Sequence, residues 1–407
     1  MDSPALEPAR ARTKLAVLVA IVLLAVLLPM VLGQDFSIPE NPLRGRFVLE
    51  QKGCLSCHAI KGEGGNIGSD LGQTKFYGSF LELASIMWNH SPEMARRMRE
   101  LDLRYPKFSR QEITELIAYL YYLRYLGEPG DLYRGRMLVR EKGCLTCHSV
   151  GGKGGDSAPA FDQLAKYVSP LFLAQALWNH GPEMDKQIRE KGLPRPTFQR
   201  GEIVDLSAYI RYASLGTAEE RLYMAPGNPK QGLNTLREKN CLACHAIDGR
   251  GSAIGPDFGR TQWNMSVTEI AALMWNHGSQ MAQMMEQEGI GWPTFSGPEM
   301  ADLIAYLYFL GFEDQAGDEK AGERLFGEKG CSYCHAPVGP GPGIAPNLAN
   351  LKTLSSPADM APIMWNHAPV MEEKVAERII NWPKLTGTDL RDLYAFLLKQ
   401  SHGAKKE

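Results

Sequence analysis

The sequence lacks several features that would assign it to common functional classes. Its 407 residues include 44 basic and 46 acidic side chains, so no excess of positive charge is present for binding nucleic acid. Its glycine-rich loops lack the Gly-Lys-Ser/Thr ending of a phosphate-binding loop. Apart from one apolar segment near the N-terminus, the hydrophobic content is that of a globular protein.

Cysteine is absent outside four copies of one pentapeptide. The copies are Cys54-Leu-Ser-Cys57-His58, Cys144-Leu-Thr-Cys147-His148, Cys241-Leu-Ala-Cys244-His245 and Cys331-Ser-Tyr-Cys334-His335. Disulfides or a thioredoxin-like redox pair need no histidine after every second cysteine, and zinc needs four ligands from paired knuckles. C-x-x-C-H is instead the attachment signature of c-type haem, in which the histidine binds iron as the proximal ligand. The sequence therefore predicts four covalently bound haem c groups, each with one iron.

The apolar segment, residues 15–32 (LAVLVAIVLLAVLLPMVL), would be about 27 Å long as a helix, close to the thickness of a hydrocarbon core. Arg10, Arg12 and Lys14 precede it, which by the positive-inside rule keeps the N-terminus cytoplasmic and exports the rest. We expect a single-pass anchor in a bacterial cytoplasmic membrane, with the haem domains in the periplasm. A cleaved signal peptide ending near Gly33 is the alternative.

The four motifs belong to a repeat of about 90 residues. Their first cysteines are 90, 97 and 90 residues apart, and other landmarks keep fixed distances from each motif. Units one and three share one loop sequence style and units two and four share another, which indicates duplication of a two-haem unit. We predict an N-terminal tail and membrane anchor over residues 1–33, followed by domains at 34–128, 129–217, 218–313 and 314–401.

Apolar residues at helical spacing predict mostly helical units. In each, a short helix enters the motif, a glycine-rich loop follows, and a second helix carries Trp-Asn-His. Pro92, Pro182 and Pro369 predict a break after that histidine in three units. Ser109 and Ser296 are the expected N-caps of last helices. We expect the tryptophans to line the haem pockets or to bond the propionates.

Each unit resembles a class I cytochrome c domain, and the resemblance covers about residues 44–400. The features that carry it are Gly-x3-hydrophobic before Cys-x-x-Cys-His, a Gly-Pro-x-hydrophobic loop and a terminal Leu-x-x-Tyr-Leu helix. The resemblance implies an all-α fold with four tandem cytochrome c-like domains after one transmembrane helix. It also implies close contact between a glycine of the first helix and an aromatic residue of the last, because glycine has no Cβ. The matching pairs are Gly45/Tyr119, Gly135/Tyr209, Gly232/Tyr306 and Gly322/Phe396.

The sixth iron ligand departs from the family pattern. Where the family usually has methionine before a proline, this chain has Tyr105, Arg195, Trp292 and Trp382. Two other candidates recur in every unit, 32 and 36 residues after the proximal histidine. We favour the methionines Met94, Met184, Met281 and Met371, because thioether ligation is what the resembling carriers use and it raises the potential. The alternative is bis-histidine ligation, with lower potentials, by His90, His180, His277 and His367.

A haem with protein ligands on both faces has no vacancy for a small-molecule substrate, so we expect outer-sphere electron transfer rather than catalysis. The expected protein is a membrane-tethered tetrahaem carrier between a membrane oxidoreductase and a downstream acceptor. Its partners would be redox proteins or a membrane respiratory complex, and not nucleic acid. The alternative is a permanent subunit of a larger quinol-oxidising or terminal oxidase complex. A peroxidase or reductase would need a unit without a distal ligand, and every unit has a candidate.

Overall fold

The computed structural model describes most of the chain after its N-terminal segment. The described residues are 41–74, 76, 78–125, 127, 129–164, 169–215, 227–261, 263, 265–337, 342–348, 354–378 and 380–403. The apolar segment at 15–32 lies outside them, and so does the predicted anchor. Within the described ranges, no helix has the length and apolar character that a membrane crossing requires.

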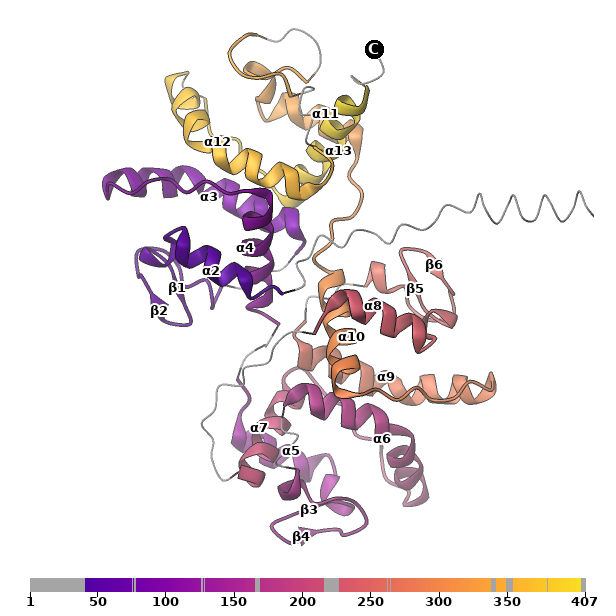
Figure 1. Ribbon diagram of the computed structural model, residues 1–407. Coiled ribbons are helices and arrows are strands. Elements are labelled where there is room, and N and C mark those ends of the chain that lie inside the picture. Colours follow the sequence, from indigo (N-terminus) through magenta and orange to yellow (C-terminus); the bar gives the residue numbers. More distant parts are fainter. Residues whose placement is uncertain are drawn as a thin grey trace, which may run out of the picture. The chain divides into compact units, whose positions relative to one another are not determined.

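The described residues are mostly helical, as predicted. The same sequence of helices repeats four times along the chain (Figure 1). Each repeat begins with a short helix: α2 (Arg44–Gln51), α5 (Leu132–Glu141), α8 (Pro229–Glu238) or α11 (Glu319–Glu328). The helix leads into a 3-10 turn formed by the first three motif residues: η1 (Cys54–Ser56), η2 (Cys144–Thr146), η5 (Cys241–Ala243) or η7 (Cys331–Tyr333). We call α2 to α4 unit 1, α5 to α7 unit 2, α8 to α10 unit 3 and α11 to α13 unit 4.

A small antiparallel hairpin follows the motif in units 1 to 3, where the sequence predicts only a glycine-rich loop. The strands are β1 (Ala59–Ile60) with β2 (Glu63–Gly64), β3 (Ser149–Val150) with β4 (Lys153–Gly154), and β5 (Ala246–Ile247) with β6 (Arg250–Gly251). Each second strand ends at a glycine with φ near +130°. A side chain is strained at that angle, so glycine is what allows the hairpin to close against the motif. Short 3-10 turns follow in units 2 and 3, η3 (Phe161–Gln163) and η6 (Phe258–Arg260).

The helix that carries Trp-Asn-His is the longest of each unit. These helices are α3 (Phe80–Glu100), α6 (Pro170–Glu190), α9 (Val267–Gln287) and α12 (Pro357–Glu377), each of 21 residues. The predicted break after the histidine is wrong, because α3, α6 and α12 continue through Pro92, Pro182 and Pro369. Histidine and methionine therefore lie one turn apart on one helix face in all four units.

Replacement donors explain why two of these prolines leave the helix intact. A helical proline removes the N–H that would bond the carbonyl four residues earlier. In α3, the Ser91 hydroxyl donates to that carbonyl, of Trp88, at 2.7 Å. In α6, the corresponding carbonyl of Trp178 accepts from the indole N–H of Trp292 at 3.1 Å. The freed carbonyls thus keep hydrogen-bond partners.

The last helices are α4 (Arg110–Tyr122), α7 (Glu202–Leu215), α10 (Gly297–Leu310) and α13 (Gly387–Gly403). The predicted N-caps Ser109 and Ser296 are confirmed. Each serine hydroxyl accepts from the N–H of the third helical residue, and that residue, Glu112 or Glu299, accepts from the serine N–H in return.

All four predicted contacts between a glycine of the first helix and an aromatic residue of the last are confirmed. A Cβ placed on any of Gly45, Gly135, Gly232 and Gly322 would lie within 3.0 Å of a backbone carbonyl oxygen and of the Cβ of the paired aromatic residue. The last helix therefore packs directly on the backbone of the first helix. The C-x-x-C-H motif begins three residues after the end of the first helix. The contact between the two helices therefore fixes where the motif starts relative to the last helix.

We predict that Gly322→Ala destabilises the protein and that Gly327→Ala does not. Both glycines lie in α11, but a Cβ on Gly322 would collide with Asp392 and Phe396, whereas one on Gly327 meets nothing within 4 Å. Overpacking at Gly322 should lower the free energy of unfolding by about 2 kcal/mol. The exposed substitution should leave it unchanged or raise it by up to ~1 kcal/mol. Denaturant unfolding measures both, and equal effects would contradict the close contact.

Units 1 and 3 meet through a reciprocal aromatic contact. The Tyr121 hydroxyl donates to the Tyr308 carbonyl at 3.0 Å, and the Tyr308 hydroxyl donates to the Tyr121 carbonyl at 2.7 Å. Tyr125 and Phe312 complete the cluster, and all four residues are fully buried. Each pair of equivalent positions is 187 residues apart in the sequence, which is the offset between the two halves of the repeat.

Glu313 adjoins this aromatic cluster. Burial, reinforced by the nearby carboxylates of Asp248 and Asp314, raises the pKa of Glu313 to about 7. A carboxyl group with a raised pKa stabilises the fold while it is protonated. That stabilisation is fully present below the unfolded pKa and is lost as the pH rises through about 7.

We therefore expect the free energy of unfolding to fall between about pH 5 and pH 8. In Glu313→Gln, that fall should be smaller by about 1–2 kcal/mol. The amide cannot ionise, so its burial is independent of pH. Thermal unfolding across this pH range measures the effect, and exposed Glu238 provides the control substitution to glutamine. An unchanged slope in Glu313→Gln would show that another group titrates.

Candidate haem sites and the contacts between units

Each C-x-x-C-H motif is folded on a tight turn that holds its three side chains together. The residue before the first cysteine is left-handed in every unit, with φ between 61° and 77°. The N–H groups of the second cysteine and of the histidine both donate to the carbonyl of the first cysteine. Burial raises the pKa of the first cysteine of each motif to about 11; these are Cys54, Cys144, Cys241 and Cys331. The turn thus brings two thiols and one imidazole to one place.

The motif histidines are all held in the same orientation. The Nδ1 atoms of His58, His148, His245 and His335 lie 2.8–3.0 Å from the carbonyls of Ser69, Pro159, Pro256 and Pro346, in each case 11 residues later. A carbonyl oxygen only accepts, so Nδ1 carries the proton and Nε2 keeps its lone pair. This is how proteins orient a histidine that binds metal.

The loops pack tightly around these imidazoles. A Cβ on Gly68 or Gly255 would lie within 3.0 Å of the His58 or His245 ring. Phe258 stacks on His245 with ring centres 4.3 Å apart, and Phe161 stacks on its counterpart in unit 2 at 4.5 Å. The motifs therefore fit covalently bound haem: two thiols on one turn, and an oriented imidazole with its lone pair free.

A carboxylate that sequence reasoning passed over braces the loop in units 1 and 3. Asp70 accepts from the backbone N–H groups of Lys61, Gly62 and Gly72 at 2.8–2.9 Å. Partial burial opposes ionisation, but these hydrogen bonds outweigh it and lower the pKa of Asp70. Asp257 makes the equivalent bonds in unit 3, so the carbonyl that holds each motif histidine sits on a fixed loop.

Both candidate sixth ligands are present on the long helices. The methionines Met94, Met184, Met281 and Met371 are half-buried. His277 and His367 are also half-buried, whereas His90 and His180 are exposed. The methionine assignment stays a prediction.

The tryptophans of Trp-Asn-His bind another unit through their indole N–H groups, contrary to the expectation that these groups bond to a propionate; the alternative, that the rings line the haem pockets, stays a prediction. Each indole N–H donates to the carbonyl of a proline in a different unit at 2.7–2.8 Å. The pairs are Trp88 with Pro383, Trp365 with Pro106, Trp178 with Pro293, and Trp275 with Pro196. Units 1 and 4 therefore exchange these bonds with each other, as do units 2 and 3.

The asparagine of the same motif strengthens each contact. Asn276 donates to the Phe198 carbonyl and accepts from the Phe198 N–H, both at 2.8 Å. The other asparagines do the same with the residue two after the partner's proline: Asn89 with Leu385, Asn179 with Phe295, and Asn366 with Phe108. Twelve hydrogen bonds of three types thus hold the two pairs of units, three for each Trp-Asn motif.

The residues that replace the family's distal methionine stack on these tryptophans. Trp382 lies 4.4 Å from Trp88 between ring centres, and Trp292 lies 4.4 Å from Trp178. Tyr105 stacks on Trp365 at 4.9 Å, and the guanidinium of Arg195 lies 4.1 Å from the centre of the Trp275 ring. All four positions before the proline serve the contact between units.

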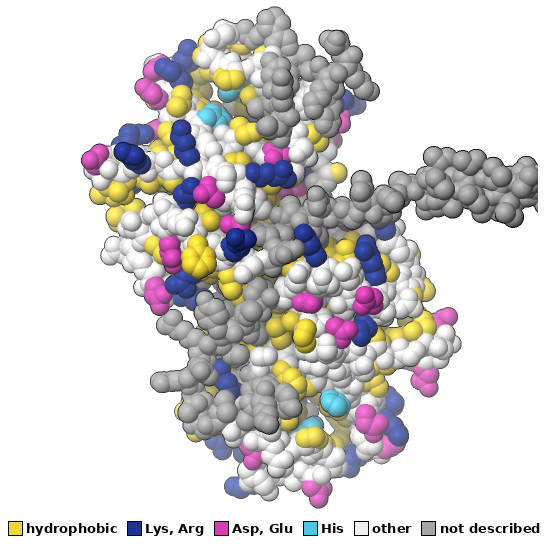
Figure 2. Space-filling view, in the orientation of Figure 1, with side chains coloured by type: hydrophobic (Ala, Val, Ile, Leu, Met, Phe, Trp, Pro, Cys, Tyr) yellow, Lys and Arg dark blue, Asp and Glu magenta, His cyan; other side chains and the backbone are white. Residues whose placement is uncertain are grey.

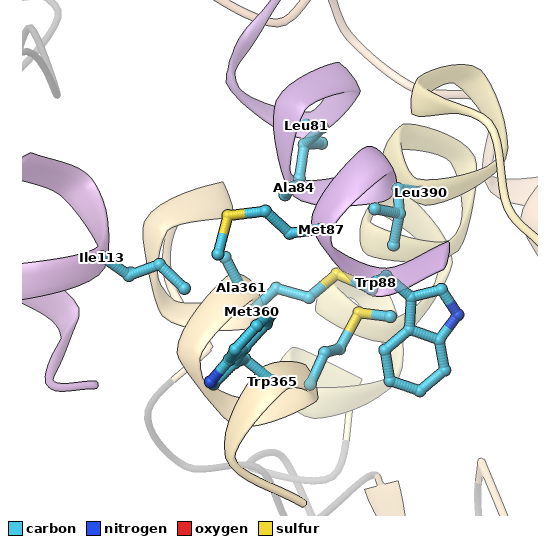
Figure 3. Close-up of a pocket in the computed structure, with 10 residues that line it drawn as sticks. Leu81, Ala84, Met87, Trp88, Ile113, Met360, Ala361, Trp365 and Leu390 are labelled. Carbon is cyan, nitrogen blue, oxygen red and sulfur yellow. The ribbon is translucent and has the colours of Figure 1, made fainter. Parts of the chain in front are cut away.

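A narrow apolar pocket marks the seam between α3 and α12 (Figure 3). It is lined from one side by Met87, Trp88 and neighbours, and from the other by Met360, Trp365 and neighbours. An equivalent pocket between α6 and α9 is lined by Trp178 and Trp275 among others. Both pockets belong to the contacts between units.

A lysine two residues before the first cysteine of each motif, which we call the motif lysine, connects the turn of the motif to the same proline segment. Lys52, Lys142 and Lys329 donate to the carbonyls of Lys107, Thr197 and Lys384, the residue after each proline, at 2.7–2.9 Å. In all four units this lysine also pairs with the acidic residue near the start of the last helix, at 2.7–3.1 Å. The proline segment therefore touches the haem motif of its own unit and the Trp-Asn of its partner.

We predict that Asn276→Ala loosens units 2 and 3. The substitution leaves the N–H and carbonyl of buried Phe198 without these partners, which should lower stability by about 2 kcal/mol or more. The control is Asn234→Ala, an exposed residue with one long hydrogen bond within its own helix. Thermal unfolding and limited proteolysis compare the two variants. Equal thermal unfolding midpoints for Asn276→Ala and Asn234→Ala would show that the contact between Asn276 and Phe198 does not hold units 2 and 3 together.

Comparison with known proteins gives one family match. Residues 231–310 and 319–401, which span units 3 and 4, each match the family model Cytochrome c. No curated protein and no solved structure shows significant similarity to the chain.

Proposed function

We propose that this chain, whose residues 231–310 and 319–401 match the Cytochrome c family model, is a haem-based electron carrier that holds four haem c groups and works tethered to a membrane. The family match covers units 3 and 4, and the proposal extends it to units 1 and 2. The observation that carries this extension is the recurrence of one motif geometry. In every unit, a carbonyl 11 residues later holds Nδ1 of the motif histidine.

The residues that would hold each haem are the two cysteines and the histidine of each motif, with a sixth ligand from the long helix. Bound haem supplies an iron that gains or loses one electron. The cysteines would fix its position, and the oriented imidazole would fix its proximal face. Burial of the first cysteine and the packed loop would keep water from one side of the site.

The contacts between units favour electron exchange within the pairs 1–4 and 2–3. The His367 ring of unit 4 lies 6.2 Å from the Trp88 ring of unit 1, measured between ring centres. We propose that neighbours in space, rather than neighbours in sequence, exchange electrons first.

A periplasmic location and a membrane tether are proposed from residues 15–32. The arginines and lysine that precede this run support an orientation with the N-terminus inside and the haem units outside, by the positive-inside rule. Figure 2 shows basic and acidic side chains interspersed over the visible face, in line with the balanced charge of the chain. We propose redox proteins or a membrane respiratory complex as partners.

Haem counting tests the proposal. The full-length protein, produced with a haem-attachment system, should carry four covalent haems by pyridine haemochrome assay and mass. Replacing Cys241 and Cys244 by alanine should remove one of them. Retention of all four, or fewer than four in the parent protein, would contradict the proposed sites.

A second measurement tests the carrier role. A potentiometric titration should account for four one-electron steps, and the resting protein should not bind carbon monoxide or cyanide tightly. Tight binding to one haem, with turnover of peroxide or of a small oxyanion, would indicate an enzyme instead. Stoichiometric co-purification with integral-membrane subunits would identify a subunit of a larger complex.

A further inference from the structure

In units 3 and 4, the histidine of Trp-Asn-His lies close to the histidine of the C-x-x-C-H motif. The ring centres of His245 and His277 lie 6.4 Å apart, with their planes at 62°. Those of His335 and His367 also lie 6.4 Å apart, with their planes at 82°. The two pairs belong to different units, so the same distance between ring centres occurs independently in unit 3 and in unit 4.

This spacing matches two imidazoles that share one metal ion. A metal–imidazole bond is about 2.0 Å long, and the ring centre lies about 1.2 Å behind the nitrogen, so the centres are about 6.4 Å apart. A direct hydrogen bond between two imidazole nitrogens would bring the centres to about 5.3 Å. Stacked rings would be closer still. The observed separation leaves room for one ion between the rings.

The hydrogen bonds of both rings in unit 4 leave the appropriate nitrogen free. Nδ1 of His367 lies 2.6 Å from the Ile363 carbonyl, and Nδ1 of His335 lies 3.0 Å from the Pro346 carbonyl. Each Nδ1 therefore carries a proton, and each Nε2 presents a lone pair.

The competing methionines are displaced along the helix. Met281 and Met371 lie four residues after the histidines, about 6 Å farther along the axis of α9 or α12. When the histidine nitrogen lies opposite the proximal ring, the methionine Cα is one turn away from that line. The methionine side chain then covers the edge of the site rather than its centre.

The segment that carries the ligand in the resembling family is also committed elsewhere. Trp292 stacks on Trp178 of unit 2, and Trp382 stacks on Trp88 of unit 1. The prolines that follow them accept from the indole N–H groups of those same partners. This segment cannot turn inward without giving up the contact between units.

We propose that His277 and His367 are the sixth iron ligands of units 3 and 4, in place of Met281 and Met371. The inference rests on the proposed function only in assuming that haem is bound. Imidazole lacks the potential-raising effect of a thioether, so units 3 and 4 become the lower-potential sites expected for bis-histidine ligation. Each spatial pair, 1–4 and 2–3, contains one of them.

The test compares two alanine variants one helical turn apart in the full-length, haem-loaded protein. His277→Ala should convert one of the four haems to a high-spin form that binds carbon monoxide. Met281→Ala should leave every haem low-spin and unable to bind carbon monoxide. Electron paramagnetic resonance and the carbon monoxide difference spectrum measure this, and haem content confirms that four haems remain in both variants.

His277→Met keeps the proposal falsifiable if the alanine variant folds poorly. It should stay six-coordinate, gain the far-red sulfur-to-iron charge-transfer band of one additional oxidised haem, and raise one potential. Loss of such a band in Met281→Ala, or a high-spin haem in that variant alone, would overturn the proposal. A parent protein with fewer than four haems would instead count against the proposed function, since haem number and haem ligation are measured separately.

Discussion

The rest of the structure depends on one reciprocal contact, in which the Trp-Asn of one unit binds a proline segment of another. In unit 2, the N–H and carbonyl groups of Phe198 in this segment lie outside any helix or sheet, and both bond to Asn276 of the neighbouring unit. Because each unit offers both halves of the contact, two units hold each other through the same bonds twice. The pairs that result, 1–4 and 2–3, are not the pairs adjacent in sequence.

The same contact explains why the chain departs from the pattern of the family that its units 3 and 4 match. The residue before the proline, where the family usually carries its distal methionine, stacks on the partner's tryptophan in all four units. The motif lysine binds the carbonyl just after that proline. A segment that serves haem ligation in the family thus serves assembly here, and the candidate sixth ligands lie on the long helix.

Features that depend on local chemistry or on one close approach were predictable. The N-caps at Ser109 and Ser296, and the glycine at Gly322 that admits Phe396, are examples. The break expected at Pro92 was not found, because a neighbouring serine hydroxyl replaces the missing donor. The role of Trp88 was missed for a related reason: an indole N–H bonds equally well to a propionate or to a carbonyl of another unit, and spacing in sequence does not distinguish them.

The sequence by itself determined the number of C-x-x-C-H motifs, the candidate proximal histidines, the helical repeat and the two candidate sixth ligands. These follow from residue type and spacing along one segment of chain. Only the tertiary structure decided which units pair, since Trp178 meets Pro293 and Trp88 meets Pro383 across 115 and 295 residues. It also set the rings of His277 and His367 6.4 Å from those of His245 and His335, because the distance between two helices or loops depends on how neighbouring elements hold them. The spacing of residues along the chain does not determine the distance between two histidine rings in the folded structure.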